Sequence, residues 1–114
     1  MYRDWKAYVK ELAGNMQSVG NGIPDTWNAF RTLSMAGKAD GVLDAKTKEL
    51  IAIGISIANR CEGCIAFHVR EAVRLGTTRE EMLETVGVAL YLGGGPASVY
   101  GTYVMEAFDQ FSKG

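Results

Sequence analysis

The fold is decided by residues 49–76, which read ELIAIGISIANRCEGCIAFHVREAVRLG. The first half of this stretch is apolar nearly all round a helix, so it should lie at the centre of the core. Asn59 is a candidate left-handed cap, because asparagine tolerates positive φ better than most residues. A second helix would then begin at Arg60 or Cys61 and stop before Gly76. We therefore expect an antiparallel pair of helices that turns at Asn59–Arg60.

The rest of the chain also has helical periodicity, with no sustained period-2 alternation between hairpin turn signals. Asp44 is a predicted N-cap, Thr78 opens a capping box, and Pro24 suits the first turn of a helix. The 114 residues fit a single domain. We predict an all-α fold of about six helices, near residues 4–19, 24–36, 44–59, 60–75, 78–92 and 96–111.

Two further features concern the central helix. Gly54 and Ala58, with Ser56 beside them, would let a neighbouring helix approach closely. The segment LIAIGISIA (50–58) also matches LETVGVALY (83–91), with Leu, Gly and aliphatic residues at corresponding places. A duplicated helix pair and chance similarity between two amphipathic helices both explain this match.

Composition limits the classes of function. The net charge is −1 and no basic run occurs, so we expect no nucleic-acid partner. The longest apolar stretch is too short to cross a bilayer, and the charged N-terminus lacks the apolar core of a signal peptide. We therefore expect a cytoplasmic protein with no membrane partner. In that reducing compartment a close cysteine pair is more often catalytic or metal-binding than a permanent cross-link.

The candidate site begins with the two cysteines and the only histidine of the chain. On one helix Cys61, Cys64 and His68 occupy positions i, i+3 and i+7, which form a single stripe. The first turn of a helix favours an anion and lowers the pKa of a thiol, and the thiolate is the nucleophile. His68 can take the thiol proton at neutral pH. The residues of an activated dithiol are therefore present within this short segment.

Glu49 joins this set only if the chain turns back at Asn59–Arg60. It would then lie ~16 Å back from the turn and His68 ~12 Å forward of it, at similar heights. In that position Glu49 could orient His68, raise its basicity or pass a proton to it.

Three other interpretations of the cysteines stay open. A zinc site would have Cys61, Cys64 and His68 as ligands, and Glu49 or a partner chain would have to complete it. A structural disulfide would stabilise little, because the closed loop is short. Two buried, inert cysteines are the third interpretation. The GGGP segment (93–96) lacks the G-K-[ST] of a phosphate loop. We expect neither a metal nor an organic cofactor.

The stretch from Glu49 to Glu81 resembles the alkylhydroperoxidase D-like branch of the carboxymuconolactone decarboxylase superfamily. The shared signature is Glu, eleven residues, Cys-x-x-Cys, three residues and His, followed by a junction that reads AVRLGTTREE here. The resemblance covers about residues 42–94. It implies an all-α fold, assembly into trimers or hexamers, and thiol-dependent peroxidase or disulfide-reductase activity.

The resemblance also implies roles for the four candidates. Cys64 is oxidised by a small hydroperoxide to a sulfenic acid, Cys61 acts as proton donor and resolving thiol, and His68 and Glu49 form a proton relay. An external dithiol, such as a lipoyl group or a thioredoxin-like protein, reduces the resulting disulfide. The fuller peroxidases of the branch are longer and carry a histidine where this chain has Gly63.

The first prediction for function is therefore a peroxiredoxin-type enzyme. One alternative is a non-enzymatic redox-sensing or partner-binding protein whose cysteine pair changes state. A second is a lyase-like relative that uses the pocket without thiol turnover. Superfamily members that decarboxylate muconolactone lack the cysteine pair, which argues against that reaction here.

Overall fold

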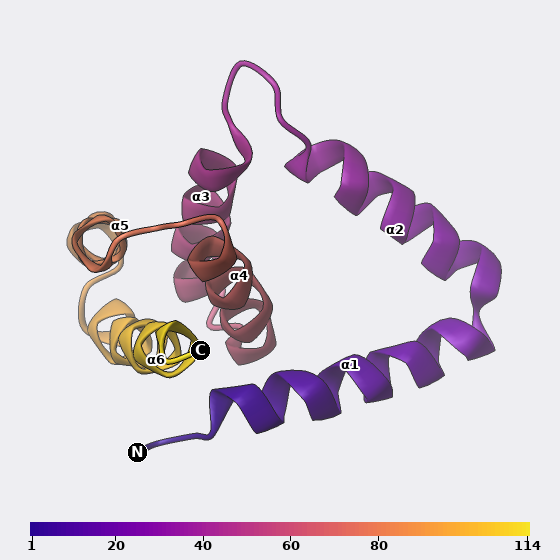
Figure 1. The fold of residues 1–114 in the computed structure, drawn as a ribbon, viewed down its shortest axis with the longest axis horizontal. Coiled ribbons are helices and arrows are strands. Elements are labelled where there is room, and N and C mark those ends of the chain that lie inside the picture. Colours follow the sequence, from indigo (N-terminus) through magenta and orange to yellow (C-terminus); the bar gives the residue numbers. More distant parts are fainter.

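The computed structural model describes residues 1–114 and contains six α-helices and no strand (Figure 1). This confirms the all-α prediction and the number of helices. The helices are α1 Trp5–Gly22, α2 Pro24–Lys38, α3 Ala45–Ala58, α4 Glu62–Arg74, α5 Arg79–Gly93 and α6 Gly95–Ser112.

The predicted helix starts are present. The Asp44 carboxylate accepts the backbone N–H of Thr47 at 2.8 Å, and this hydrogen bond lowers the pKa of Asp44. Thr78 and Glu81 form a complete capping box at the start of α5. Pro24 is the first residue of α2, where its missing N–H costs nothing.

The turn between α3 and α4 differs from the prediction by one residue. Asn59 is right-handed, with φ −82°, and Arg60 has the positive φ of 54°. The N–H of Arg60 donates to the carbonyl of Ile57, and that of Cys61 donates to Ser56. This is a Schellman ending, in which the residue after the C-cap takes the left-handed conformation. Asn59 has the side chain suited to that conformation but occupies the cap position itself.

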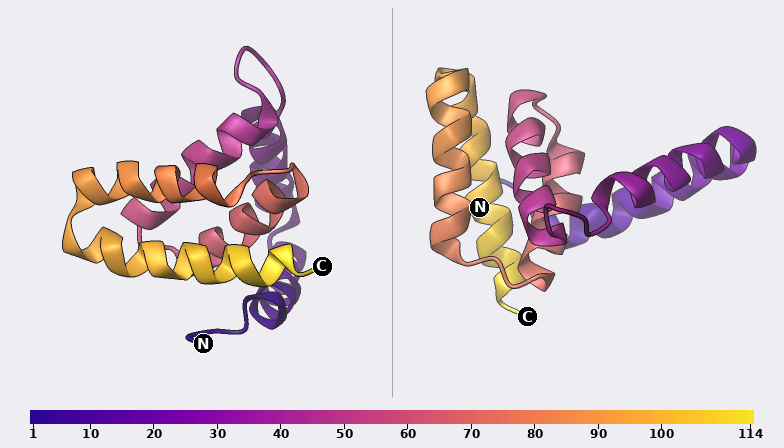
Figure 2. Two further views of the ribbon diagram at one scale, coloured as in Figure 1. Left: turned by 60° about the vertical axis from the view of Figure 1, so that its left-hand side comes forward. Right: turned by 90° about the horizontal axis from the view of Figure 1, so that it is seen from above.

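Helices α3 to α6 form the body of the molecule as two helical hairpins, α3–α4 and α5–α6, that lie side by side (Figure 2). The two matching sequence segments are the first helix of each hairpin. The buried core comes mostly from α3, α4 and α6, with α1 and α5 adding a few side chains. Its larger members are Trp5, Ile53, Ile57, Ile65, Val69, Met82, Val104 and Phe108.

Helices α1 and α2 form an arm that leaves this body at an angle (Figure 1). The start of α1 is anchored, because Trp5 and Val9 are buried against α4 and α6. In contrast, α2 contains no buried residue. The radius of gyration is 14.3 Å, above the ~13 Å expected for a compact chain of this size, which agrees with a projecting arm.

The prediction that α3 is central to the core is only partly right. Ile53 and Ile57 are buried, but Ile51 and Ile55 are 47% and 54% exposed. They line an apolar groove of about 560 Å³ between α3 and α5. The expected close approach of a helix at Gly54 is absent within the chain, since a Cβ built there meets no atom within 4 Å. The apolar second half of α3 therefore lines a groove that the rest of the chain leaves open.

Candidate functional site

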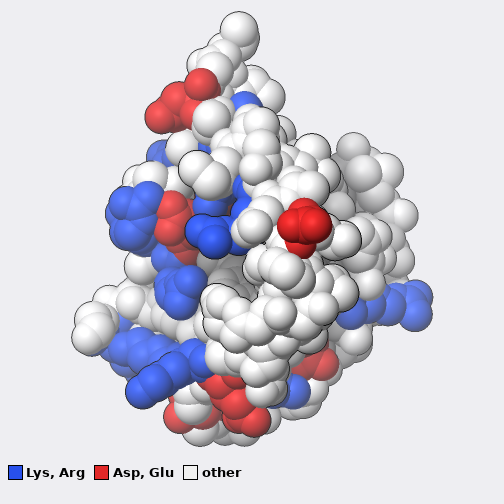
Figure 3. Space-filling view, turned by 90° about the vertical axis from the view of Figure 1, so that its right-hand side faces the viewer, with Lys and Arg blue, Asp and Glu red and all other residues white.

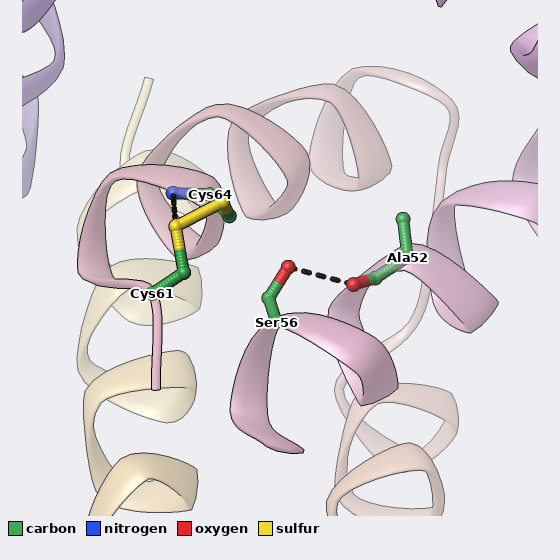
Figure 4. The surroundings of a disulfide bond; sticks show 4 residues. All are labelled: Ala52, Ser56, Cys61 and Cys64. Carbon is green, nitrogen blue, oxygen red and sulfur yellow. Dashed lines mark hydrogen bonds between the residues drawn. A yellow bond between two sulfur atoms is a disulfide. The ribbon is translucent and has the colours of Figure 1, made fainter. Parts of the chain in front are cut away.

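The two cysteines form a disulfide at the start of α4 (Figure 4). Cys61 is the N-cap of α4, because the Schellman ending of α3 delivers the chain there with an extended backbone. The backbone N–H of Cys64 donates to the Sγ of Cys61 at 3.2 Å. A helix start stabilises negative charge, so this position favours the Cys61 thiolate once the disulfide is reduced. Both cysteines are half-buried.

Glu49 and His68 meet across the α3–α4 hairpin. The Oε2 of Glu49 lies 2.7 Å from the Nδ1 of His68, which confirms the contact predicted from the antiparallel arrangement. When Glu49 is a carboxylate it accepts this hydrogen bond from Nδ1–H, an arrangement that leaves Nε2 free to act as a base. The Glu49 side chain is 5% exposed and that of His68 38%. The pair thus links a buried carboxylate to an imidazole that solvent can reach.

A cleft of about 440 Å³ brings these groups together. It is bounded by the start of α4 and by the inner sides of α1 and α2. The residues that line it are Tyr8, Leu12, Met16, Phe30, Ser34, Cys61, Gly63, Cys64, Phe67 and His68. Three of the four predicted site residues therefore line one cleft, and Glu49 contacts it through His68.

The side chains around the sulfurs bear on the zinc interpretation and on which groups can donate a proton to the site. No group of three or more His, Cys, Asp or Glu side chains is arranged to hold a metal ion, and His68 faces Glu49. The hydroxyl of Ser56, on α3 near the disulfide, donates to the carbonyl of Ala52 at 2.6 Å (Figure 4). Its only proton is therefore used within α3.

The N-terminal segment makes a group of contacts that could not be predicted from the sequence. Arg3 pairs with Glu62, the residue that follows Cys61, at 3.2 Å. Its guanidinium also lies 4.0 Å from the ring centroid of Tyr8, a cation–π contact. No spacing rule joins residues so far apart in the sequence, and only the fold brings them to the cysteine loop.

Glu106 on α6 holds this segment in place. It accepts hydrogen bonds from the backbone N–H groups of Tyr2 and Arg3 and from the indole Nε1–H of Trp5. Partial burial raises the pKa of this carboxyl, but these hydrogen bonds outweigh it and leave the pKa of Glu106 below its ordinary value. The ionised carboxylate thus fastens the start of the chain to α6.

The surface carries charges of both signs. On the face in Figure 3, basic side chains gather towards one side with acidic ones among them, and a large uncharged area remains. None of the helices is long and apolar enough to cross a membrane.

The comparisons with known proteins point in one direction. The model of the carboxymuconolactone decarboxylase family matches residues 23–107. A crystal structure of a member of that family from Legionella pneumophila is 42% identical, with a TM-score of 0.92, over 95% of this chain and 96% of the other. A family member from Thermotoga maritima, for which a part in the antioxidative response has been suggested, is 30% identical, with a TM-score of 0.73, over 77% of this chain and 91% of its own. An uncharacterised protein from Cupriavidus necator is 32% identical over 96% of both chains.

Proposed function

The chain belongs to the carboxymuconolactone decarboxylase family, and on that basis we propose that it is a thiol-dependent peroxidase and disulfide oxidoreductase of the alkylhydroperoxidase type. The observation that carries the proposal is the Glu49–His68 pair, which lies on the same cleft as the Cys61–Cys64 disulfide. The suggested antioxidative role of the Thermotoga maritima relative supports it further. A cytoplasmic location fits a disulfide that must be reduced in every cycle.

The first step is the oxidation of Cys64. His68 lies one helical turn beyond Cys64 and takes the thiol proton on its free Nε2, while Glu49 stabilises the imidazolium through Nδ1. The Cys64 thiolate attacks the terminal oxygen of a small hydroperoxide, so an S–O bond forms as the O–O bond breaks. Cys64 becomes a sulfenic acid and the peroxide is reduced to an alcohol or water.

The second step closes the disulfide. Cys61, whose thiolate is favoured at the N-cap of α4, attacks the sulfenic sulfur of Cys64 and releases water. An external dithiol, such as a lipoyl group or a thioredoxin-like protein, then reduces the pair by exchange. Cys61 suits the role of leaving group in that exchange, because a thiol of low pKa leaves faster.

The test is peroxide turnover with a panel of dithiol donors that includes dihydrolipoamide. We expect the reduced protein to lose two thiols per chain on addition of peroxide and to recover them over many turnovers. Without an added dithiol, Cys61→Ser should consume one peroxide per chain and stop at the sulfenic acid, because the resolving thiol is missing. Retained peroxide consumption by Cys64→Ser would falsify the thiol mechanism.

The same measurement separates the enzyme from the alternatives. A redox sensor would lose its thiols reversibly without sustained peroxide consumption. A lyase-like relative would show no peroxide turnover that depends on the two cysteines.

We also propose that the chain forms a homo-oligomer through the groove between α3 and α5. The residues that line it include the exposed Ile51, Ile55 and Leu92, together with Gly54 and Ala89. The only polar residues along it are two threonines, and none is charged. Exposed apolar side chains and an uncharged groove thus lie together on one surface. Such a surface can pair with the same surface of a second copy of this chain.

The total surface agrees with this assembly. The chain exposes 6986 Å², whereas a compact monomer of 12.4 kDa is expected to expose about 6,100 Å². The projecting arm of α1 and α2 and the uncovered groove both add to this excess of roughly 900 Å². The trimer or hexamer implied by the family resemblance would cover such a surface.

Light scattering after size-exclusion chromatography tests the assembly. We expect a mass of several chains for the unmodified protein and a smaller species for Ile55→Lys, which introduces a charge into the groove. Val42→Lys is the control, because Val42 is fully exposed in the loop between α2 and α3. A monomeric unmodified protein, or equal masses for both variants, would contradict the proposal.

A further inference from the structure

The N-cap position favours Cys61 as a thiolate, which makes it a poor proton donor, and apart from it the cleft contains few groups that can donate a proton. His68 is committed to Glu49 through Nδ1 and has its remaining nitrogen for the Cys64 thiol. The hydroxyl of Ser56 already donates its hydrogen bond to the carbonyl of Ala52. Among the hydroxyl groups that line the cleft, those of Tyr8 and Ser34 remain.

The loop between the cysteines supplies no acid of its own. Glu62 is paired with Arg3. At Gly63 a Cβ would lie 2.7 Å from Cδ2 of Leu12, so a side chain there would require the Leu12 side chain to move. The space beside the second cysteine is therefore filled by α1 rather than by a residue of the loop.

Tyr8 is the polar side chain that α1 brings to this space. Its hydroxyl oxygen lies 3.5 Å from the same Cβ position on Gly63, directly before Cys64. The ring is held on two sides, by the Arg3 guanidinium at 4.0 Å and by an edge contact with Trp5 at 5.9 Å between centroids. The hydroxyl forms no hydrogen bond within the chain, so a fixed donor faces the cleft unused.

We propose that Tyr8 is a further catalytic residue, whose hydroxyl donates a proton to the leaving oxygen of the peroxide. This assignment rests on the proposed function. The Cys64 thiolate attacks the terminal oxygen, the O–O bond breaks, and the departing alkoxide takes the Tyr8 proton and leaves as the alcohol. The sulfur is oxidised by two electrons and the peroxide is reduced by two. The phenolate regains its proton from water, because the cleft is open to solvent at His68.

Two proton tasks are thus divided between two residues. His68 removes a proton from the nucleophile, and Tyr8 supplies one to the leaving group. Such a donor is most valuable when the leaving group is strongly basic, as for an alkoxide, and least valuable for a carboxylate.

The experiment compares Tyr8→Phe with the unmodified, pre-reduced protein in rapid-mixing measurements of thiol loss. Three oxidants are used: tert-butyl hydroperoxide, hydrogen peroxide and peracetic acid. We expect Tyr8→Phe to slow the reaction with tert-butyl hydroperoxide about 10- to 100-fold and that with peracetic acid less than about threefold. Circular dichroism confirms that the variant is folded.

Two variants serve as controls. Tyr100→Phe removes a hydroxyl from a half-buried tyrosine outside the cleft, and Ser34→Ala removes the other cleft hydroxyl. Tyr100→Phe should react like the unmodified protein, and Ser34→Ala tests whether the second cleft hydroxyl is the donor. Equal slowing of Tyr8→Phe with all three oxidants would reduce Tyr8 to a structural role, and a large effect of Ser34→Ala would assign the donor to Ser34.

The failures of the two proposals are distinguishable. If the unmodified protein does not lose two thiols with any peroxide, the proposed function fails and this assignment fails with it. If the unmodified protein reacts and Tyr8→Phe reacts at the same rate, only the role of Tyr8 is wrong.

Discussion

The two hairpins of the body share a layout but differ in chemistry. When Leu50 is aligned with Leu83 and Gly54 with Gly87, each site residue of the first hairpin acquires a counterpart in the second. The pairs are Glu49 with Met82, Cys61 with Gly94, Cys64 with Ala97, and His68 with Gly101. Cys61 and Gly94 are even the N-caps of α4 and α6.

The counterparts are apolar or small, and three of them are buried. Met82 is 0% exposed and Ala97 4%, and Gly101 is also buried. The α5–α6 hairpin therefore closes on itself at the places where α3–α4 faces a cleft. The difference teaches that this hairpin can pack without any of the four site residues. Folding therefore does not require these four residues in α3–α4, which agrees with the proposed function.

The largest expected effect is the loss of peroxide reduction when serine replaces Cys64, compared with serine at the corresponding position of α6. Cys64→Ser should lower the rate of peroxide reduction about 10³-fold or more, since it removes the nucleophile. Ala97→Ser, at the corresponding place in α6, should leave the rate within about twofold of the unmodified protein, because α6 contributes nothing to the cleft. Coupled assays under reducing conditions measure both. A comparable loss in Ala97→Ser would end the functional contrast between the hairpins.

The next effect concerns the acidic member of the site. Glu49→Gln keeps the size of the side chain but removes the charge that orients His68 and stabilises its protonated form. We expect peroxide reduction to fall about 10- to 100-fold. Met82→Leu, at the matching position of α5, conserves volume and should change stability by less than about 1.5 kcal/mol without affecting the rate. Rates and urea denaturation curves distinguish the two outcomes.

A smaller effect tests the packing of the second hairpin. A Cβ at Gly101 would lie 2.6 Å from Cγ1 of Val86, so Gly101→Ala should destabilise the protein by about 1–3 kcal/mol through overpacking. Gly87→Ala meets no atom within 4 Å and lies within α5, so it should stabilise by about 0.5–1 kcal/mol. Equal urea midpoints for the two variants would show that the hairpin is not tightly closed at Gly101.

The smallest effect concerns Glu106, which fastens the N-terminal segment to α6 of the second hairpin. Because the pKa of Glu106 is lowered in the folded protein, its contribution to stability is present above the ordinary glutamate pKa of ~4.3. That contribution is lost as the pH falls from there through the folded pKa. We expect urea midpoints to decline over this range more steeply for the unmodified protein than for Glu106→Gln. Parallel pH profiles would mean that Glu106 does not hold the segment.

Much of the first hairpin could be predicted from the sequence. The spacing of Glu49, Cys61 and His68 on two antiparallel helices was sufficient, because helical rise is nearly constant along a regular helix. The turn itself was harder. Intrinsic preference favours Asn59 for positive φ, but the last helical hydrogen bonds assign that conformation to Arg60.

The remainder depends on contacts between distant parts of the chain. The exposure of Ile51 and Ile55 could not be foreseen, because an apolar helix has the same sequence signature in a core and in an interface. The place of Tyr8 was hidden for a similar reason. On an amphipathic helix a cleft tyrosine has the same spacing as a core residue, and only the docking of α1 through Trp5 and Glu106 distinguishes them.

The two tryptophans give the molecule a built-in optical readout. Trp5 is buried beside Tyr8, so its fluorescence reports on the wall of the cleft. Trp27 lies on α2, where its ring covers Gly20 of α1, and it reports on the elbow of the arm. Replacing Trp27 with phenylalanine would leave Trp5 as the one emitting indole, in edge contact with Tyr8 of the cleft wall. Its emission would then give a dye-free signal for changes at that wall, including any that accompany the proposed redox cycle.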